Sequence, residues 1–216
     1  MKKIMWCLAI SLVPIVLTLA MYGQLPDRIP VHFNSQGQVD GWGPPTVALG
    51  FAFVPLGLTL LFVLLPRLSP RRFETELFAS AWWTAANIIV GLVALLPLCL
   101  LWGAFNGSTV STRWVLGAVA LGLVLLGNLM GKLRRNFWLG IRTPWTLTSE
   151  QVWYRTHRMG GKVIVICALL AVATLISGLP EGVAVAFLAA AALIPVGYSL
   201  VCYKRLERSG QLDSSP

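Results

Sequence analysis

The side chains best suited to chemistry gather in one segment, NFWLGIRTPWTLTSEQVWYRTHR, which spans residues 136–158. It is basic and aromatic, whereas most of the chain is Leu, Val, Ala and Gly. Guanidinium groups reach phosphates and indole rings anchor at the headgroup level, so the segment suits a membrane interface or a partner surface. The residues that we expect to bind a partner are Arg142, Thr143, Pro144, Trp145, Glu150, Trp153, His157 and Arg158.

A second segment, GQLPDRIPVHFNSQGQVDGWGPP at residues 23–45, combines prolines with turn residues. The segment is predicted to form a small hairpin, because its prolines favour extended backbone, its residues briefly alternate between polar and apolar, and residues 34–37 are turn formers. A second turn is predicted at Asp40–Gly41. The hairpin either forms an edge that recognises a peptide or lipid, or only caps the helices. The ligand-binding candidates are Pro26, Pro30, His32, Phe33, Gly37, Asp40, Gly41 and Trp42.

Neither segment contains a known catalytic motif. There is no His-Glu-x-x-His, no Gly-x-Ser-x-Gly and no phosphate-binding glycine loop. His32 with Asp27 and Asp40 is a weak candidate for a metal site, because the three ligands are scattered in a turn-rich loop. We therefore expect a protein that is not an enzyme and that has no cofactor and no metal.

The elements that must position these segments are long apolar helices. The chain has 216 residues, of which 56% are hydrophobic and only 12% are charged. Six apolar runs approach the roughly 20 residues that a membrane-spanning helix needs. They are Ile4–Tyr22, Thr46–Pro66, Leu77–Trp102, Trp114–Met130, Val163–Leu179 and Val183–Tyr203. The fold class is therefore an all-α integral membrane protein with six transmembrane helices.

Basic residues predict the orientation of these helices. Of the seventeen Lys and Arg, all but Arg28 and Arg113 fall at the termini or in the second and fourth loops. Because cytoplasmic loops carry such an excess, we expect both termini and residues 132–162 inside and residues 23–45 outside. Anionic headgroups explain the net charge of +9, so no nucleic acid is expected. The first run fits a retained helix better than a cleaved signal peptide.

None of the six runs contains Asp, Glu, Lys, Arg or His, which counts against proton-coupled transport. Asn87 and Asn128 are polar residues within runs that also contain small residues. They either hydrogen-bond between helices or line an intramembrane cavity. The cysteines all lie within apolar runs, and we expect them to pack there.

The local structure of the basic segment can also be predicted. Pro144 favours extended backbone at the preceding residue. Thr148 then fits an N-cap, with Gln151 completing a capping box and Leu147 packing on Val152. We expect the helix that begins there to break at Gly160–Gly161, and we expect the three tryptophans of the segment to act as interfacial anchors.

GIRTPWTLTSEQVWYRTHRMGG resembles the signature of the Sdp immunity protein family, and LPDRIPVHFNSQGQVDGWG resembles the outer loop of a domain of unknown function that often precedes it. The resemblance implies a six-helix bacterial inner-membrane protein linked to immunity against a secreted peptide toxin. In some members it also implies tethering of a soluble repressor. Carried over by position, the motif falls on Gly140, Arg142, Thr143, Pro144, Trp145, Thr146, Leu147, Glu150, Val152, Trp153, His157, Arg158 and Gly160.

These observations predict three regions: a two-helix unit with its outer loop at 1–66, a four-helix membrane domain at 67–205 and a cytoplasmic tail at 206–216. The expected function is non-enzymatic immunity and signalling, with anionic lipids, a secreted peptide toxin and a cytoplasmic repressor as partners. A small-molecule or lipid transporter with a cavity between bent helices is the alternative, and a membrane enzyme is a third.

Overall fold

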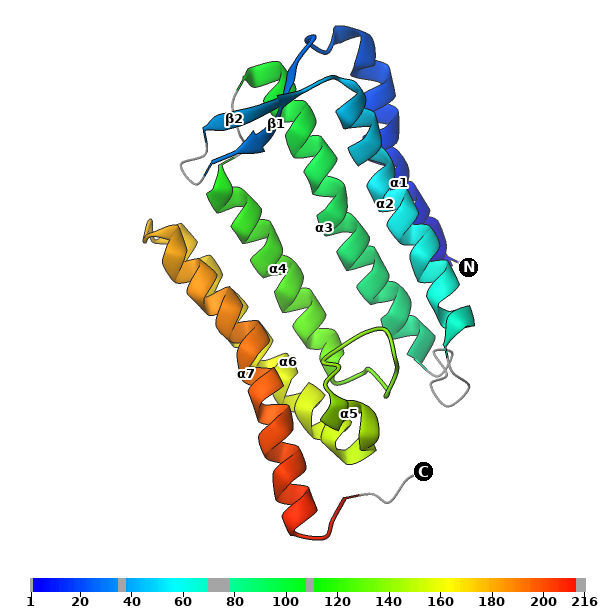
Figure 1. Cartoon of the computed structure of the whole chain (residues 1–216), viewed down its shortest axis with the longest axis vertical. Helices are drawn as coiled ribbons and strands as arrows, with labels where there is room; N and C mark the ends of the chain where they lie inside the picture. Colours follow the sequence, from blue (N-terminus) through cyan, green and yellow to red (C-terminus); the bar gives the residue numbers. More distant parts are fainter. Residues whose placement is uncertain (1, 35–37, 70–77, 108–110, 213–216) are drawn as a thin grey trace. The chain divides into compact units, whose positions relative to one another are not determined.

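Six long helices dominate the structure, a computed structural model that describes residues 2–34, 38–69, 78–107 and 111–212. Their bounds are α1 Lys2–Met21, α2 Thr46–Leu64, α3 Ala79–Asn106, α4 Thr112–Met130, α6 Glu150–Ile176 and α7 Glu181–Arg208 (Figure 1). Each of these described helices is long and apolar enough to cross a membrane. The predicted six-helix membrane fold is confirmed.

Shorter elements connect the long helices. Two 3₁₀ turns, η1 Tyr22–Gln24 and η2 Leu65–Leu68, extend α1 and α2. The antiparallel strands β1 Ile29–Phe33 and β2 Val39–Gly43 form the predicted hairpin. The short helix α5, Pro144–Thr148, precedes α6 and was not predicted as a separate element.

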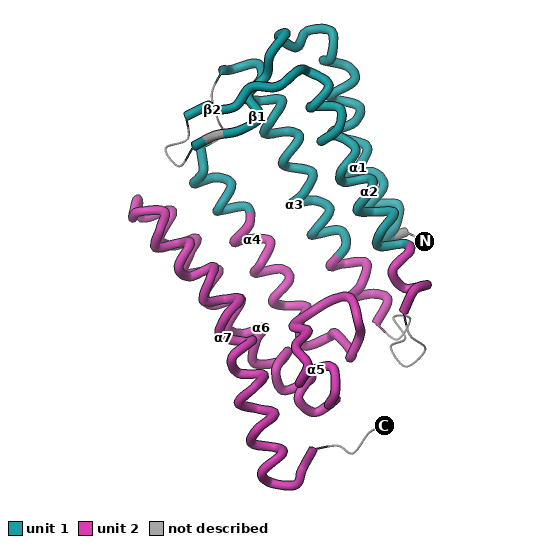
Figure 2. Tube along the Cα trace, viewed as in Figure 1, with its two compact units in different colours: residues 1–63, 86–118 teal, residues 64–85, 119–216 magenta. Residues whose placement is uncertain are grey.

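The chain divides into two compact units (Figure 2). Unit 1 comprises residues 1–63 and 86–118, which include the hairpin, and unit 2 comprises residues 64–85 and 119–216, which include α5, α6 and α7. Helices α3 and α4 each contribute to both units. The sequence-based division at residues 66 and 205 stays a prediction.

Polar side chains tie the helices of unit 1 together. The buried Ser11 hydroxyl on α1 lies 2.8 Å from the Thr59 hydroxyl and donates to the Pro55 carbonyl oxygen on α2 at 3.1 Å. The Asn87 amide on α3 donates to the Lys3 carbonyl oxygen on α1 at 3.2 Å. Hydrogen bonds between membrane helices contribute about 0.6 kcal/mol on average, so these contacts add specificity more than stability.

Close packing holds α6 in unit 2. A Cβ on Gly161 would lie 2.7 Å from the Gly127 carbonyl oxygen on α4, and one on Gly160 would lie 3.0 Å from Pro195 Cβ on α7. Neighbouring helices can approach this closely only where a side chain is absent. The predicted break at Gly160–Gly161 is therefore wrong, because α6 runs without interruption from Glu150 to Ile176 and uses these glycines for packing.

Candidate functional site

The basic segment of unit 2 begins with a turn that the buried Asn136 side chain organises. Its amide group donates to the carbonyl oxygens of Arg134 and Leu139, each at 2.9 Å. Its carbonyl oxygen accepts from the backbone N–H groups of Trp138 at 2.9 Å and Leu139 at 2.7 Å. An asparagine side chain offers two donors and two acceptor lone pairs, and all four are used here. The turn is therefore fixed in one conformation.

Trp153 joins this turn to α6. Its side chain is 0% exposed, and its indole N–H donates to the Leu133 carbonyl oxygen at 2.8 Å. The ring stacks on His157, one turn further along α6, with ring centroids 3.9 Å apart and planes at 22°. The expectation that Trp153 anchors at a membrane interface is wrong, because the ring is enclosed by unit 2.

His157 connects α6 to the loop before α5. Its Nε2 accepts a hydrogen bond from the Ile141 N–H at 2.9 Å, and its Nδ1 lies 2.9 Å from the Trp153 carbonyl oxygen. This pattern fits the neutral imidazole with its proton on Nδ1, because an acceptor nitrogen must carry a lone pair. Gly140 has φ +111°, and a Cβ there would collide with the His157 ring. The loop can therefore reach the histidine only through a glycine.

Thr143 caps α5 and ties it to α7. Its hydroxyl accepts from the Thr146 N–H at 3.3 Å, and the Thr146 hydroxyl accepts from the Thr143 N–H at 2.9 Å, which forms a capping box. Pro144 follows at the first helical position, where a missing N–H costs nothing. The Thr143 hydroxyl also lies 3.0 Å from that of Ser199 on α7. The extended backbone predicted before Pro144 is confirmed, with φ −99° and ψ 161° at Thr143.

The N-cap of α6 is Ser149, whose hydroxyl accepts from the Val152 N–H at 3.2 Å. The predicted cap at Thr148 is wrong, and the capping box with Gln151 and the contact of Leu147 with Val152 as a staple fail with it. Thr148 is the last residue of α5, and its hydroxyl turns back to the Pro144 carbonyl oxygen at 3.0 Å. An N-cap needs extended backbone. Of Thr148 and Ser149, only Ser149 has it, with φ −128° and ψ 128°.

The eight predicted partner-binding residues therefore separate by exposure. Thr143, Trp153 and His157 are buried and hold the framework together. Trp145 is half-buried and packs against the cluster of Val152, Cys202 and Leu206. The exposed side chains, which remain accessible to a partner, are those of Arg142, Pro144, Glu150 and Arg158.

Arg142 is held in place despite its exposure. Its Nη1 donates to the Phe137 carbonyl oxygen at 2.7 Å. One N–H of the guanidinium group is therefore engaged by the turn that Asn136 organises, and the residue as a whole is exposed. A fixed guanidinium loses less conformational entropy on binding than a mobile one.

Sequence reasoning missed three residues of this framework. Asn136 is a residue type that often hydrogen-bonds to nearby backbone, so its place before a loop was a usable signal. Ser149 could have been weighed against Thr148, since both are good N-caps. Ser199 gave no signal, because its bond to Thr143 joins residues that lie 56 positions apart.

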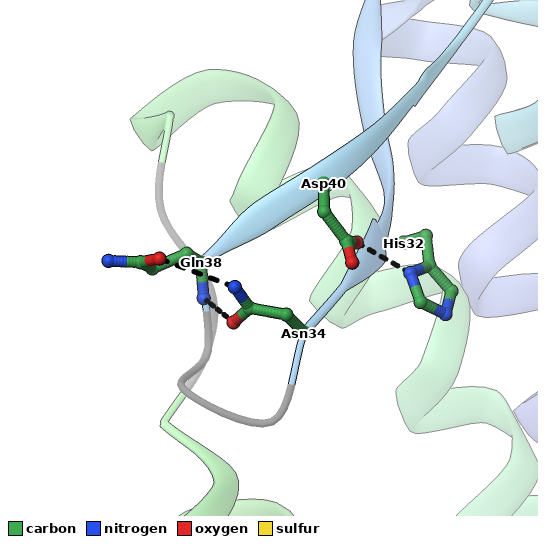
Figure 3. A network of polar contacts seen from close by, with 4 residues as sticks. All are labelled: His32, Asn34, Gln38 and Asp40. Atoms are coloured by element: carbon green, nitrogen blue, oxygen red, sulfur yellow. Dashed lines mark hydrogen bonds and ion pairs between the residues drawn. The ribbon is translucent and has the colours of Figure 1, made fainter.

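The hairpin of unit 1 is the second candidate site (Figure 3). Ile29 pairs with Gly43 and Pro30 with Trp42, and the register shifts on either side of His32. The Asn34 side-chain oxygen accepts a hydrogen bond from the Gln38 N–H at 2.9 Å. The predicted ligand residue at position 37 lies outside the described residues.

Asp40 and Gly41 lie inside β2, so the second turn predicted there is wrong. His32 Nδ1 is paired with the Asp40 carboxylate across the strands (Figure 3). A Cβ on Gly41 would lie 2.7 Å from His32 Cβ, so the glycine makes room for the histidine opposite it rather than for a turn. Both His32 and Asp40 are exposed.

One side of the hairpin is anchored and the other is open. Ile29 is fully buried against Ala48 of α2 and Ala104 of α3, and Pro30 is buried as well. Trp42 is 50% exposed, which is unusual for so large an apolar ring in a soluble surface but suits a membrane interface. Pro26 is also exposed, and the Phe33 side chain lies outside what the structure describes. The hairpin therefore presents an exposed tryptophan on a fixed base.

Asn87 and Asn128 belong to different units. Asn87 donates to the Lys3 carbonyl oxygen within unit 1. Asn128 is exposed in unit 2 and lines a groove of about 350 Å³ with Gly131 and Arg158. A cavity that contains both asparagines stays a prediction.

With six apolar helices among the described residues and a small hairpin, this chain is a multi-span membrane protein. Residues 132–200 match the SdpI/YfhL protein family, and residues 9–66 match a domain of unknown function, DUF1648. Residues 132–200 are therefore similar to the SdpI/YfhL family, and the match to the domain of unknown function lies on their N-terminal side. The framework around His157 lies in the first match and the hairpin in the second.

Immunity protein SdpI of Bacillus subtilis (strain 168) is 28% identical to this chain over 171 residues. The similarity covers 79% of this chain and 80% of that protein. No solved structure matches this chain. The similarity thus extends well beyond the basic segment and includes most of the membrane helices.

Proposed function

We propose that this protein is a non-enzymatic immunity and signalling protein of the bacterial cytoplasmic membrane, which protects its cell against a secreted antimicrobial peptide. The observation that carries the proposal is the match of residues 132–200 to the SdpI/YfhL family. That region contains the whole framework built on Asn136, Trp153 and His157. Similarity to an immunity protein over most of both chains supports the same class of function.

The outer hairpin is the proposed site of peptide recognition. A secreted peptide arrives at the outer leaflet, where the basic-residue pattern predicts residues 23–45 to lie. The buried Ile29 and Pro30 fix the hairpin, and the exposed Trp42 offers an apolar contact. A preorganised surface binds at a lower entropic cost than a mobile loop.

The exposed residues of the basic segment are the proposed site for a cytoplasmic regulator. Arg142 and Glu150 present opposite charges close together in the chain, on a framework whose buried bonds hold the backbone still. A soluble protein with complementary charges would be recognised by such a fixed pattern. Diffuse attraction to headgroups needs no fixed geometry.

Deletion of the gene tests the immunity proposal. Cells with and without the gene are exposed to purified membrane-active peptides and to peptide fractions of the organism's own culture supernatant. Survival and membrane potential are recorded. We expect the deletion strain to depolarise at a lower dose of at least one fraction, and expression of the wild-type chain to restore protection. Equal dose responses for every fraction would refute the proposal.

Matched variants in the complemented strain test the outer hairpin and the basic segment one at a time. Trp42→Ser removes the exposed ring of the hairpin without touching the buried Ile29, and Trp6→Ser on α1 is the control, since Trp6 is 66% exposed. We expect only Trp42→Ser to lower protection. If it protects as well as the wild type, and replacement of residues 27–43 by a Gly/Ser linker does so too, the hairpin is not the recognition site.

On the other face, we expect Arg142→Ala and Trp145→Ala to disturb function more than Lys204→Ala with Arg205→Ala. Lys204 is paired with Glu207 in the tail of α7 at 2.8 Å, and the tail charges act mainly as headgroup attraction. Because Trp145 also packs on Val152, its variant must first be shown to unfold at the wild-type temperature. Equal losses that vanish together at high salt would mean that the segment is only an anchor.

A further inference from the structure

A groove in unit 2 opens between the end of α4 and the first half of α6. Its volume is about 350 Å³, which lies within the range of roughly 300–1,000 Å³ that is common for ligand sites. Gly127, Asn128 and Gly131 form the α4 side. The proposed function assigns no ligand to this groove, and of the exposed residues proposed to meet a regulator only Arg158 lines it.

The two ends of the groove differ in polarity. Arg158 and Lys162 line one end, four residues apart on α6 and therefore on the same face. Val165 and Ile166 continue that face by one further turn and are apolar. The groove thus passes from two cations to hydrocarbon along about 12 Å of helix, at the rise of about 1.5 Å per residue.

Among the described residues, neither Arg158 nor Lys162 has an ion-pair partner, and both line the groove together with Asn128. Two cations held side by side repel each other, and an anion between them removes that repulsion. Their other possible role is to bind the carbonyl oxygens at the C-terminal end of α4. No such hydrogen bond from Arg158 or Lys162 occurs within the described part of the chain.

We propose that this groove binds one anionic phospholipid, with the headgroup phosphate between Arg158 and Lys162 and an acyl chain along Val165 and Ile166. The apolar run of α6 begins at Val163, so Lys162 lies where hydrocarbon gives way to headgroups. The missing side chain at Gly131 leaves room for the headgroup, because a Cβ there would meet nothing within 4 Å. Two cations followed by an apolar stretch match the phosphate and the acyl chain of a phospholipid, whereas a soluble anion would use the cations alone.

Two variants of the full chain test the site in complementary ways. The double variant Arg158→Gln, Lys162→Gln removes both charges of the groove. Its control is the double variant Arg155→Gln, Arg205→Gln, which removes two exposed charges elsewhere. Each basic residue near an anionic surface strengthens binding about fivefold, so we expect loss of the first pair to weaken lipid binding about 25-fold. We expect the control pair to change it by less than about threefold.

Gly131→Leu, directly after α4, fills the groove while leaving both cations in place. Gly117→Leu within α4 is its control, because a Cβ there also meets nothing within 4 Å. Native mass spectrometry of the purified protein, titrated with phosphatidylglycerol or phosphatidylcholine, measures the bound lipid. We expect the wild type and Gly117→Leu to retain one phosphatidylglycerol in preference to phosphatidylcholine, and Gly131→Leu to lose this preference.

Three results would overturn the assignment. Equal losses in the two charge variants would mean diffuse attraction to headgroups. Retention of the lipid by Gly131→Leu would place it outside the groove. Displacement of the lipid by millimolar inorganic phosphate or glycerol phosphate would mean a site for a soluble anion. Circular dichroism and gel filtration verify folding, and Gly131→Leu decides the question alone if the double charge variant does not fold.

Discussion

Replacing His157 by Phe should destabilise unit 2 while preserving the stack on Trp153. The phenyl ring keeps the aromatic contact, whose centroids are now 3.9 Å apart, but it cannot accept the Ile141 N–H or donate to the Trp153 carbonyl oxygen. A buried donor without a partner costs about 1–3 kcal/mol, and the second bond contributes about 1 kcal/mol. We therefore expect the free energy of unfolding to fall by about 2–4 kcal/mol.

The matched control is His157→Gln, since a glutamine side-chain oxygen can accept the Ile141 N–H. Thermal unfolding in a mild detergent, followed by tryptophan fluorescence, compares both variants with the wild type. At roughly 2–4 °C per kcal/mol for a chain of this size, a loss of about 3 kcal/mol lowers the midpoint by roughly 6–12 °C. The glutamine variant should lose less than half of that. Wild-type stability of the Phe variant, or equal losses in both variants, would refute the reasoning.

Two further predictions concern orientation and packing. Orientation is tested in a chain whose four cysteines are replaced by Ala. A maleimide that cannot cross the membrane should label Gln38→Cys on intact cells and Gln151→Cys only after lysis. The reverse pattern would overturn the predicted orientation. Gly127→Ala should lower the free energy of unfolding by about 1–3 kcal/mol, because its Cβ would lie 2.8 Å from the Val165 side chain. Gly117→Ala has open space and should have no such effect, and similar unfolding temperatures for both would contradict the close packing.

The membrane helices were predictable because the bilayer imposes length and composition on each segment. Every expected run corresponds to a helix, and the ends differ where polar residues continue the helix into water. Thus α6 begins at Glu150 rather than at Val163, because hydrophobicity identifies where a helix meets hydrocarbon and not where its hydrogen bonds start. The hairpin was predictable from its prolines and turn residues, except that Gly41 serves the contact with His32.

The candidate site was predictable as a location but not as a set of contacts. Tryptophan and histidine in a basic segment indicated function, yet Trp153 and His157 are buried because Leu133 and Ile141 supply backbone partners that the sequence pattern does not reveal. The shift of the N-cap from Thr148 to Ser149 followed from a one-turn helix too short to give a periodic signal. Exposure, which separates Arg142 from its buried neighbours, depends on tertiary packing.

The unbroken course of α6 has a mechanical consequence. Its 27 residues form a rod about 40 Å long, of which the apolar part, Val163–Ile176, accounts for about 21 Å. Because the rod has no joint at Gly160–Gly161, its apolar end and the end that bears His157 must move together. A tilt of roughly 5° about Ile176 displaces His157, which lies 19 residues away, by about 2.5 Å. Such a displacement would take the 2.9 Å hydrogen bond between His157 and Ile141 out of hydrogen-bonding range, so the loop must follow the helix or release it.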